Sequence, residues 1–104
     1  MKWFEDSKSV LLKDIFGKEI RIKAVVFDNL GRGDFGVFLA DCGDDTISFL
    51  TGAKSMMGGI FKIFAYHGII IEKKMVYDLP ESWNIVLMQK RSKDGFFYVD
   101  FQGF

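Results

Sequence analysis

The chain changes its hydrophobic period within DTISFLTGAKSMM, residues 45–57. Before Gly52 apolar and polar residues alternate, which places Ile47 and Phe49 on one face of a strand. Beyond Gly52 the apolar residues recur at the spacing of one helical face, at Met56, Ile60, Ile63 and Phe64. This stretch therefore predicts a strand that leads directly into a helix over residues 54–64.

Composition predicts one domain, residues 1–104, because a chain of 104 residues builds a single hydrophobic core. Twelve Phe, three Tyr and two Trp are a high aromatic content for a domain that cannot bury all of them. Fourteen basic residues balance fourteen acidic ones, so no global field attracts nucleic acid. Any nucleic-acid site must be a local patch.

The sequence favours a reducing compartment, because Cys42 is the only cysteine and no internal disulfide can form. Charged residues Lys2, Glu5 and Asp6 lie where a signal peptide would need an apolar run. No stretch approaches the length of a membrane span. We expect a cytoplasmic, soluble protein that does not associate with a membrane.

Upstream of residue 45 the pattern predicts a short helix and a β-hairpin. An apolar stripe with capping residues favours the helix over residues 6–17. Alternating residues 19–27 form the clearest strand of the sequence, and residues 35–41 form the next. The turn between them, residues 28–34, is rich in Gly, Asn and Asp.

The predicted central helix contains Gly58 and Gly59. Two glycines inside a helix cost about 2 kcal/mol relative to alanines, although packing can override this. Gly68 is positioned to end the helix, and we expect residues 69–71 to be extended.

The last third of the chain predicts a second hairpin. Pro80 starts a new unit, because the residue before a proline avoids helical geometry. Strands are expected over residues 83–91 and 96–101, and Asp94-Gly95 between them is a strong hairpin signal.

This order of elements, three strands, a helix and two strands, predicts a mainly β fold. It describes the OB-fold, a five-stranded barrel, with one helix between strands 3 and 4 and a possible short N-terminal helix. The alternative is another small α+β protein with a helix on one face of its sheet.

Several short motifs follow one another in the second half. A strand enters a Ser/Thr-rich helix start over residues 47–55, and Leu-Pro at 79–80 precedes a strand over residues 83–88. A basic segment, residues 89–93, leads to a Gly-aromatic-Tyr strand over residues 95–99. In these motifs the chain resembles small single-stranded DNA-binding proteins of bacteriophages and mobile elements. The resemblance implies an OB-fold that acts in DNA replication or recombination.

The first candidate binding surface is the outward face of the strand over residues 19–27. Its alternation places Arg21, Lys23 and Phe27 together. Cations that track phosphates beside a ring that stacks on a base suit single-stranded nucleic acid. The alternative is an ordinary solvated strand face with Phe27 beneath a loop.

Phe38 is the second candidate. It has the opposite parity to Phe35, Val37 and Leu39, which we expect in the core. Its ring would then face outward between two small residues, where a base could stack on it. The alternative is that both faces are covered and Phe38 belongs to a second small core.

The hairpin loops supply the remaining candidates, a basic tip with neighbouring aromatic rings. They are Lys90, Arg91, Lys93, Phe96 and Tyr98 in the last hairpin, and Arg32 in the first. The alternative is a solvated hairpin tip with no binding role.

No residues form a catalytic or metal-binding pattern, so we expect no enzyme activity, metal or cofactor. His67 has no Cys or carboxylate close in sequence, and the end of the helix is its expected setting. Cys42 has no His near it. Asp41, Asp44 and Asp45 lack the spacing of a calcium loop.

The sequence therefore predicts a non-enzymatic OB-fold module that binds single-stranded DNA largely without sequence preference, by aromatic stacking and local basic residues. The alternative is a protein–protein interaction module, such as a phage-encoded host-factor inhibitor or an assembly component, because interfaces favour aromatic residues. We also expect a homodimer or another homo-oligomer, since a small aromatic domain leaves an apolar patch for a second copy.

Overall fold

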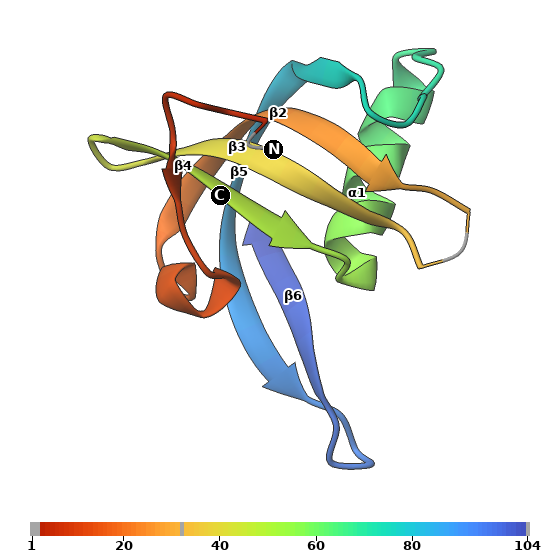
Figure 1. The fold of residues 1–104 in the computed structure, drawn as a ribbon. Helices are drawn as coiled ribbons and strands as arrows, with labels where there is room; N and C mark the ends of the chain where they lie inside the picture. Colours follow the sequence, from red (N-terminus) through yellow and green to blue (C-terminus); the bar gives the residue numbers. More distant parts are fainter. Residues whose placement is uncertain (1–2, 32, 104) are drawn as a thin grey trace.

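A six-stranded sheet and one α-helix form the part of the chain that the computed structural model describes, residues 3–31 and 33–103 (Figure 1). The elements in chain order are β1 (Lys8–Ser9), the 3-10 helix η1 (Leu12–Ile15), β2 (Glu19–Asn29), β3 (Phe35–Cys42), β4 (Asp45–Thr51), α1 (Lys54–Tyr66), β5 (Val76–Arg91) and β6 (Phe97–Gly103). The prediction of a mainly β fold is confirmed. Within the described residues, no helix is both long and apolar enough to cross a membrane.

The sheet is open, with the strand order β1-β4-β3-β2-β5-β6. The pairing of β1 with β4 is parallel, and every other pairing is antiparallel. Since β1 and β6 at the two ends do not pair with each other, the predicted closed five-stranded barrel is wrong.

The N-terminal segment explains why the sheet stays open. Closure would require β6 to pair along the edge of β4, but β1 already pairs there, with Lys8 opposite Ile47 and Ser9 opposite Ser48. The Val10 N–H also donates to the Ser48 carbonyl at 3.0 Å. The predicted helix over residues 6–17 is therefore wrong, apart from the single 3-10 turn of η1.

The extra strand also changes where the helix lies in the order of elements. The helix prediction from the hydrophobic period is confirmed over residues 54–64, which lie within α1. However, α1 follows the fourth strand of a six-stranded sheet, so its predicted place between strands 3 and 4 is wrong. Residues 69–71, expected to be extended, belong to no strand.

A β-bulge in β2 reverses the predicted inward parity of that strand. The register to both neighbouring strands shifts between Ile22 and Ala24. Ile22 belongs to the core cluster before the bulge, whereas Val25 and Phe27 belong to it after the bulge. The prediction that Phe27 shares an outward face with the cations of β2 is wrong, because its ring is fully buried and stacks on Phe61 at 5.5 Å.

Phe38 also lies in the core, because the buried parity of β3 is that of Gly36, Phe38 and Ala40. Phe38 lies opposite Val25 in β2 and opposite Phe49 in β4, and cross-strand neighbours share a face. Its ring is fully buried and stacks on Phe49 with centroids 5.6 Å apart, while Val37 and Leu39 are only half-buried. The prediction that Phe38 faces outward is wrong.

Gly59 lets α1 approach β5 and β6 closely. A Cβ at this position would lie 2.8 Å from the ring of Trp83 and 3.2 Å from the ring of Phe101, which themselves pack edge to face at 5.3 Å. A Cβ at Gly58 would meet nothing within 4 Å. One of the two helix glycines is thus required by packing, and the other is not.

Candidate nucleic-acid interface

The sheet has two faces. The core face carries the buried cluster, and we call the opposite side the outer face. Cross-strand neighbours Arg21, Asp41 and Thr46 form one row of the outer face, from β2 across β3 to β4. Val37 and Leu50 are neighbours in another row, and Leu50 is 57% exposed.

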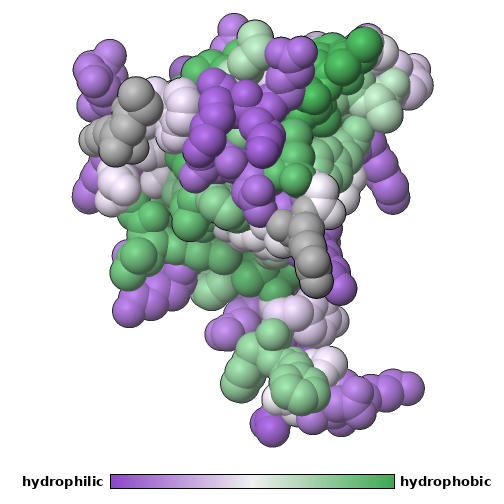
Figure 2. Space-filling model, turned by 45° about the vertical axis from the view of Figure 1, so that its right-hand side comes forward, coloured by the Kyte–Doolittle hydropathy of each residue, from purple (hydrophilic) through white to green (hydrophobic). Residues whose placement is uncertain are grey.

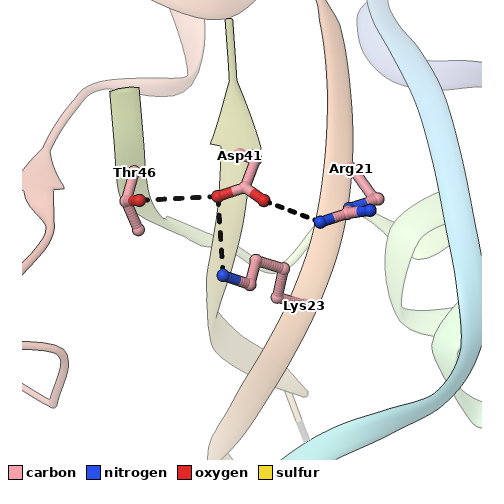
Figure 3. A network of polar contacts seen from close by, with 4 residues as sticks. All are labelled: Arg21, Lys23, Asp41 and Thr46. Atoms are coloured by element: carbon pink, nitrogen blue, oxygen red, sulfur yellow. Dashed lines mark hydrogen bonds and ion pairs between the residues drawn. The ribbon is translucent and has the colours of Figure 1, made fainter. Parts of the chain in front are cut away.

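Three charged residues form a compact cluster on the outer face (Figure 3). Arg21 Nη2 lies 3.0 Å from Asp41 Oδ2, and Lys23 Nζ lies 3.6 Å from Asp41 Oδ1. The Thr46 hydroxyl donates to Asp41 Oδ1 at 3.4 Å. Both predicted cations of β2 are exposed, as expected, but they share one carboxylate, which offsets only one of their two charges.

A recess of about 290 Å³ lies between the N-terminal residues and the outer face. Its walls include Trp3, Phe4, Val37 and Leu50. Sequence reasoning did not select Trp3, because no periodic pattern around it places its ring on a face of the fold.

The hairpin of β5 and β6 extends away from the rest of the sheet (Figure 1). It forms the protrusion at the bottom of Figure 2, where hydrophobic and hydrophilic surfaces are mixed. Its turn is closed by Ser92, whose Oγ accepts from the Phe96 N–H at 3.1 Å, and by Gly95 with a φ of +86°. The predicted Asp-Gly hairpin is confirmed.

Three consecutive aromatic rings are exposed at this tip. Phe96 is 74% exposed, Phe97 is 66% exposed and Tyr98 is 48% exposed. They stay exposed because the two strands of the hairpin continue beyond the core, so alternate side chains have no opposing layer to pack against.

The two faces of the hairpin each pair an aromatic ring with a cation. Lys90 lies opposite Tyr98 on the outer face, and Arg91 lies opposite Phe97 on the core side. The Arg91 guanidinium carbon lies 5.7 Å from the centroid of the Phe97 ring, within the range of a cation–π contact.

The cations of the hairpin differ in their partners. Lys90 Nζ lies 2.9 Å from Asp100 Oδ2, and this hydrogen bond raises the pKa of Lys90 and lowers the pKa of Asp100. Within the part of the chain that the structure describes, neither Arg91 nor Lys93 forms an ion pair. These two cations are available to a bound phosphate.

The structure thus divides the ten predicted binding residues into groups. Seven are exposed on the outer face or the hairpin: Arg21, Lys23, Lys90, Arg91, Lys93, Phe96 and Tyr98. Phe27 and Phe38 are buried and cannot stack on a base, and Arg32 lies outside the described residues.

Sequence reasoning missed Phe97. Phe97 shares its parity with Val99 and Phe101, which both pack against the core. The signal that could have identified it is its position only two residues after Gly95, where a hairpin strand is too far from the sheet to be covered.

No group of three or more His, Cys, Asp or Glu side chains that could hold a metal ion occurs among residues 3–31 and 33–103. His67 is the C-cap of α1, as expected, and its Nε2 lies 2.9 Å from a carboxylate oxygen of Glu81 in β5.

Comparisons of the chain with protein-family models, curated proteins and solved structures gave no match. The resemblance to phage and mobile-element DNA-binding proteins therefore stays a prediction.

Proposed function

We propose that this protein is a non-enzymatic module that binds single-stranded DNA through the tip of the β5–β6 hairpin, with little sequence preference. One observation supports this most directly. The consecutive residues Phe96, Phe97 and Tyr98 are all exposed, and the cations Arg91 and Lys93 lie in the same hairpin. Exposed rings next to unpaired cations are the composition of a single-strand binding surface, because rings stack on bases and cations attract phosphates.

The arrangement of the strands supports the same function. After β1 the elements follow in the order β2, β3, β4, α1, β5 and β6, and β2 lies between β3 and β5 in the sheet. This is the connectivity of an OB-fold in which the closing pair, β4 with β6, is not made. We propose that the domain is such an open variant. The loop between its last two strands is where OB-folds bind oligonucleotides, and here that loop is the aromatic tip.

Stacking supplies most of the affinity in this proposal. Each stacked base contributes about 1–3 kcal/mol, so two or three rings support useful binding. Two unpaired cations would release counterions from about two phosphates, giving a slope of about −1.4 in log K against log salt. Binding should thus depend on salt only weakly.

The test is fluorescence anisotropy with a labelled oligothymidylate and the variant Phe97→Ala. Loss of one stacked base should weaken binding by about 1–3 kcal/mol, which is about 5- to 150-fold, with folding stability unchanged. Tyr66→Ala is the matched control, because Tyr66 is 84% exposed but lies at the end of α1. Equal affinities for both variants and the wild type would contradict the assignment of the tip.

The second candidate is a protein–protein interaction module. It is favoured by the outer face, where Asp41 offsets one of the two charges of Arg21 and Lys23 and Leu50 is exposed. Interface centres are depleted in charge and enriched in aromatic residues and Arg. A protein interface of this kind would not bind oligothymidylate with the salt slope expected for DNA, so titrations at several salt concentrations separate the two functions.

A further inference from the structure

Asp41 lies between the two cations of β2 on the outer face (Figure 3). One of its carboxylate oxygens lies 3.0 Å from Arg21 Nη2, and the other lies 3.6 Å from Lys23 Nζ. Its side chain is 30% exposed, whereas those of Arg21 and Lys23 are 54% and 44% exposed. The Asp41 side chain is therefore less exposed than the two cationic side chains that contact it.

The sheet itself holds this carboxylate in place. Asp41 is the direct cross-strand neighbour of Arg21 in β2 and of Thr46 in β4. The Thr46 hydroxyl donates to Asp41 Oδ1, which fixes the carboxylate from the side away from Arg21. Strands β2 and β4 on either side thus place the carboxylate next to two cations that form no other ion pair among the described residues.

Carboxylates and phosphates compete for the same donors. A guanidinium binds either group through the same N–H groups, and a lysine ammonium attracts either by charge. A backbone phosphate on this face would have to displace Asp41 and then remain next to its negative charge.

We propose that Asp41 determines which part of the protein a DNA strand occupies, by keeping phosphates off Arg21 and Lys23 and so confining the strand to the β5–β6 hairpin. This inference rests on the proposed function, but it makes a separate claim. The outer face has a second phosphate-binding position that Asp41 blocks.

The variant Asp41→Asn tests this claim because it removes the charge and keeps the shape of the side chain. It should release two cations, increase affinity for oligothymidylate at low salt, and steepen the slope of log K against log salt by up to about 1.4. The length of strand that one protein molecule occupies should also increase, since the strand would continue from the hairpin onto the outer face.

Two controls make the result specific. Asp45→Asn changes the net charge by the same amount. Asp45 is exposed, has the opposite parity to its neighbour Thr46, and forms no ion pair with any described residue. Adding Arg21→Gln and Lys23→Gln to Asp41→Asn should cancel the gain. If Asp41→Asn does not fold, as judged by circular dichroism, Asp41→Ser removes the charge with a smaller side chain.

Each outcome of these titrations decides the claim. A gain for Asp41→Asn that exceeds the gain for Asp45→Asn and is lost in the triple variant supports it. The same change for both single variants overturns it and leaves the proposed function standing. Binding by Asp41→Asn but not by the wild type supports the blocked position while refuting the proposed function of the wild type. No binding by either protein at low salt refutes both.

Discussion

Phe38 shows how one buried ring changes the expected result of a simple mutation. The ring is fully buried, stacks on Phe49 and lies opposite Val25. We expect Phe38→Ala to lower the free energy of unfolding by about 3–5 kcal/mol through cavity formation, measured by urea denaturation. The affinity of the fraction that remains folded for oligothymidylate should not change. A stable Phe38→Ala variant with weakened binding would show instead that Phe38 belongs to the binding interface.

Lys90 and Asp100 form an exposed pair whose pH dependence has a defined sign. The hydrogen bond from Lys90, with a second from the Phe101 backbone, lowers the pKa of Asp100 below its ordinary value of 3.8. A carboxyl group with a lowered pKa stabilises the folded hairpin above its ordinary pKa, and this contribution is lost as the pH falls through the lowered value.

An NMR titration of the Asp100 carboxyl carbon checks this directly. The midpoint should lie below 3.8 in the wild type and move upward toward 3.8 in Lys90→Gln. A wild-type midpoint at or above the ordinary value, or one that Lys90→Gln leaves unchanged, would show that the pair does not form in solution.

At the scale of elements, the packing of α1 on β5 and β6 depends on one glycine of a pair. A Cβ at Gly59 would lie 2.8 Å from Trp83, whereas Gly58 faces open space. Gly59→Ala should therefore destabilise the fold by about 1–3 kcal/mol through overpacking. Gly58→Ala should stabilise it by about 1 kcal/mol through helix propensity.

Urea unfolding of the two variants side by side is a matched measurement, because both add one methyl group to the same helix. Opposite signs are expected. The same sign and size for both variants would mean that α1 does not approach Trp83 as closely as the structure shows.

The elements with a strong period could be predicted from the sequence. Residues 54–64 repeat apolar side chains over three turns, and Asp94-Gly95 sets the last hairpin, so both were identified. Strand β1 has two residues, which is too short for any period, and its place is fixed by the edge of β4 rather than by its own sequence. A segment of this kind can be recognised only when its partner strand is known.

Part of the candidate site could be predicted because exposure there follows from chain position. The hairpin cations Lys90, Arg91 and Lys93 are exposed because a tip has no opposing layer. Phe27 was assigned by counting parity from one end of β2, and the bulge between Ile22 and Ala24 reverses that count. Phe38 was assigned by taking Phe35, Val37 and Leu39 as core residues, whereas the buried face of β3 is the other one. A bulge depends on tertiary packing, and no residue near Lys23 marks it.

At the scale of the whole molecule, the balance of charge bears on the proposed function. Fourteen cations and fourteen anions leave no long-range attraction, and the outer-face cations are paired with Asp41. Under the proposed function, DNA binding therefore relies on stacking at the projecting hairpin. The expected homodimer or other homo-oligomer stays a prediction, in which a second copy would add a second aromatic tip.

The most direct test of the proposed function is a salt series of anisotropy titrations with the wild-type protein, comparing a labelled oligothymidylate with a duplex of the same length. Stacking requires unpaired bases, so the single strand should bind more tightly than the duplex at every salt concentration. Its slope in log K against log salt should be about −1.4, as expected for two phosphates. Tighter binding of the duplex, or no binding of the single strand at low salt, would contradict the account.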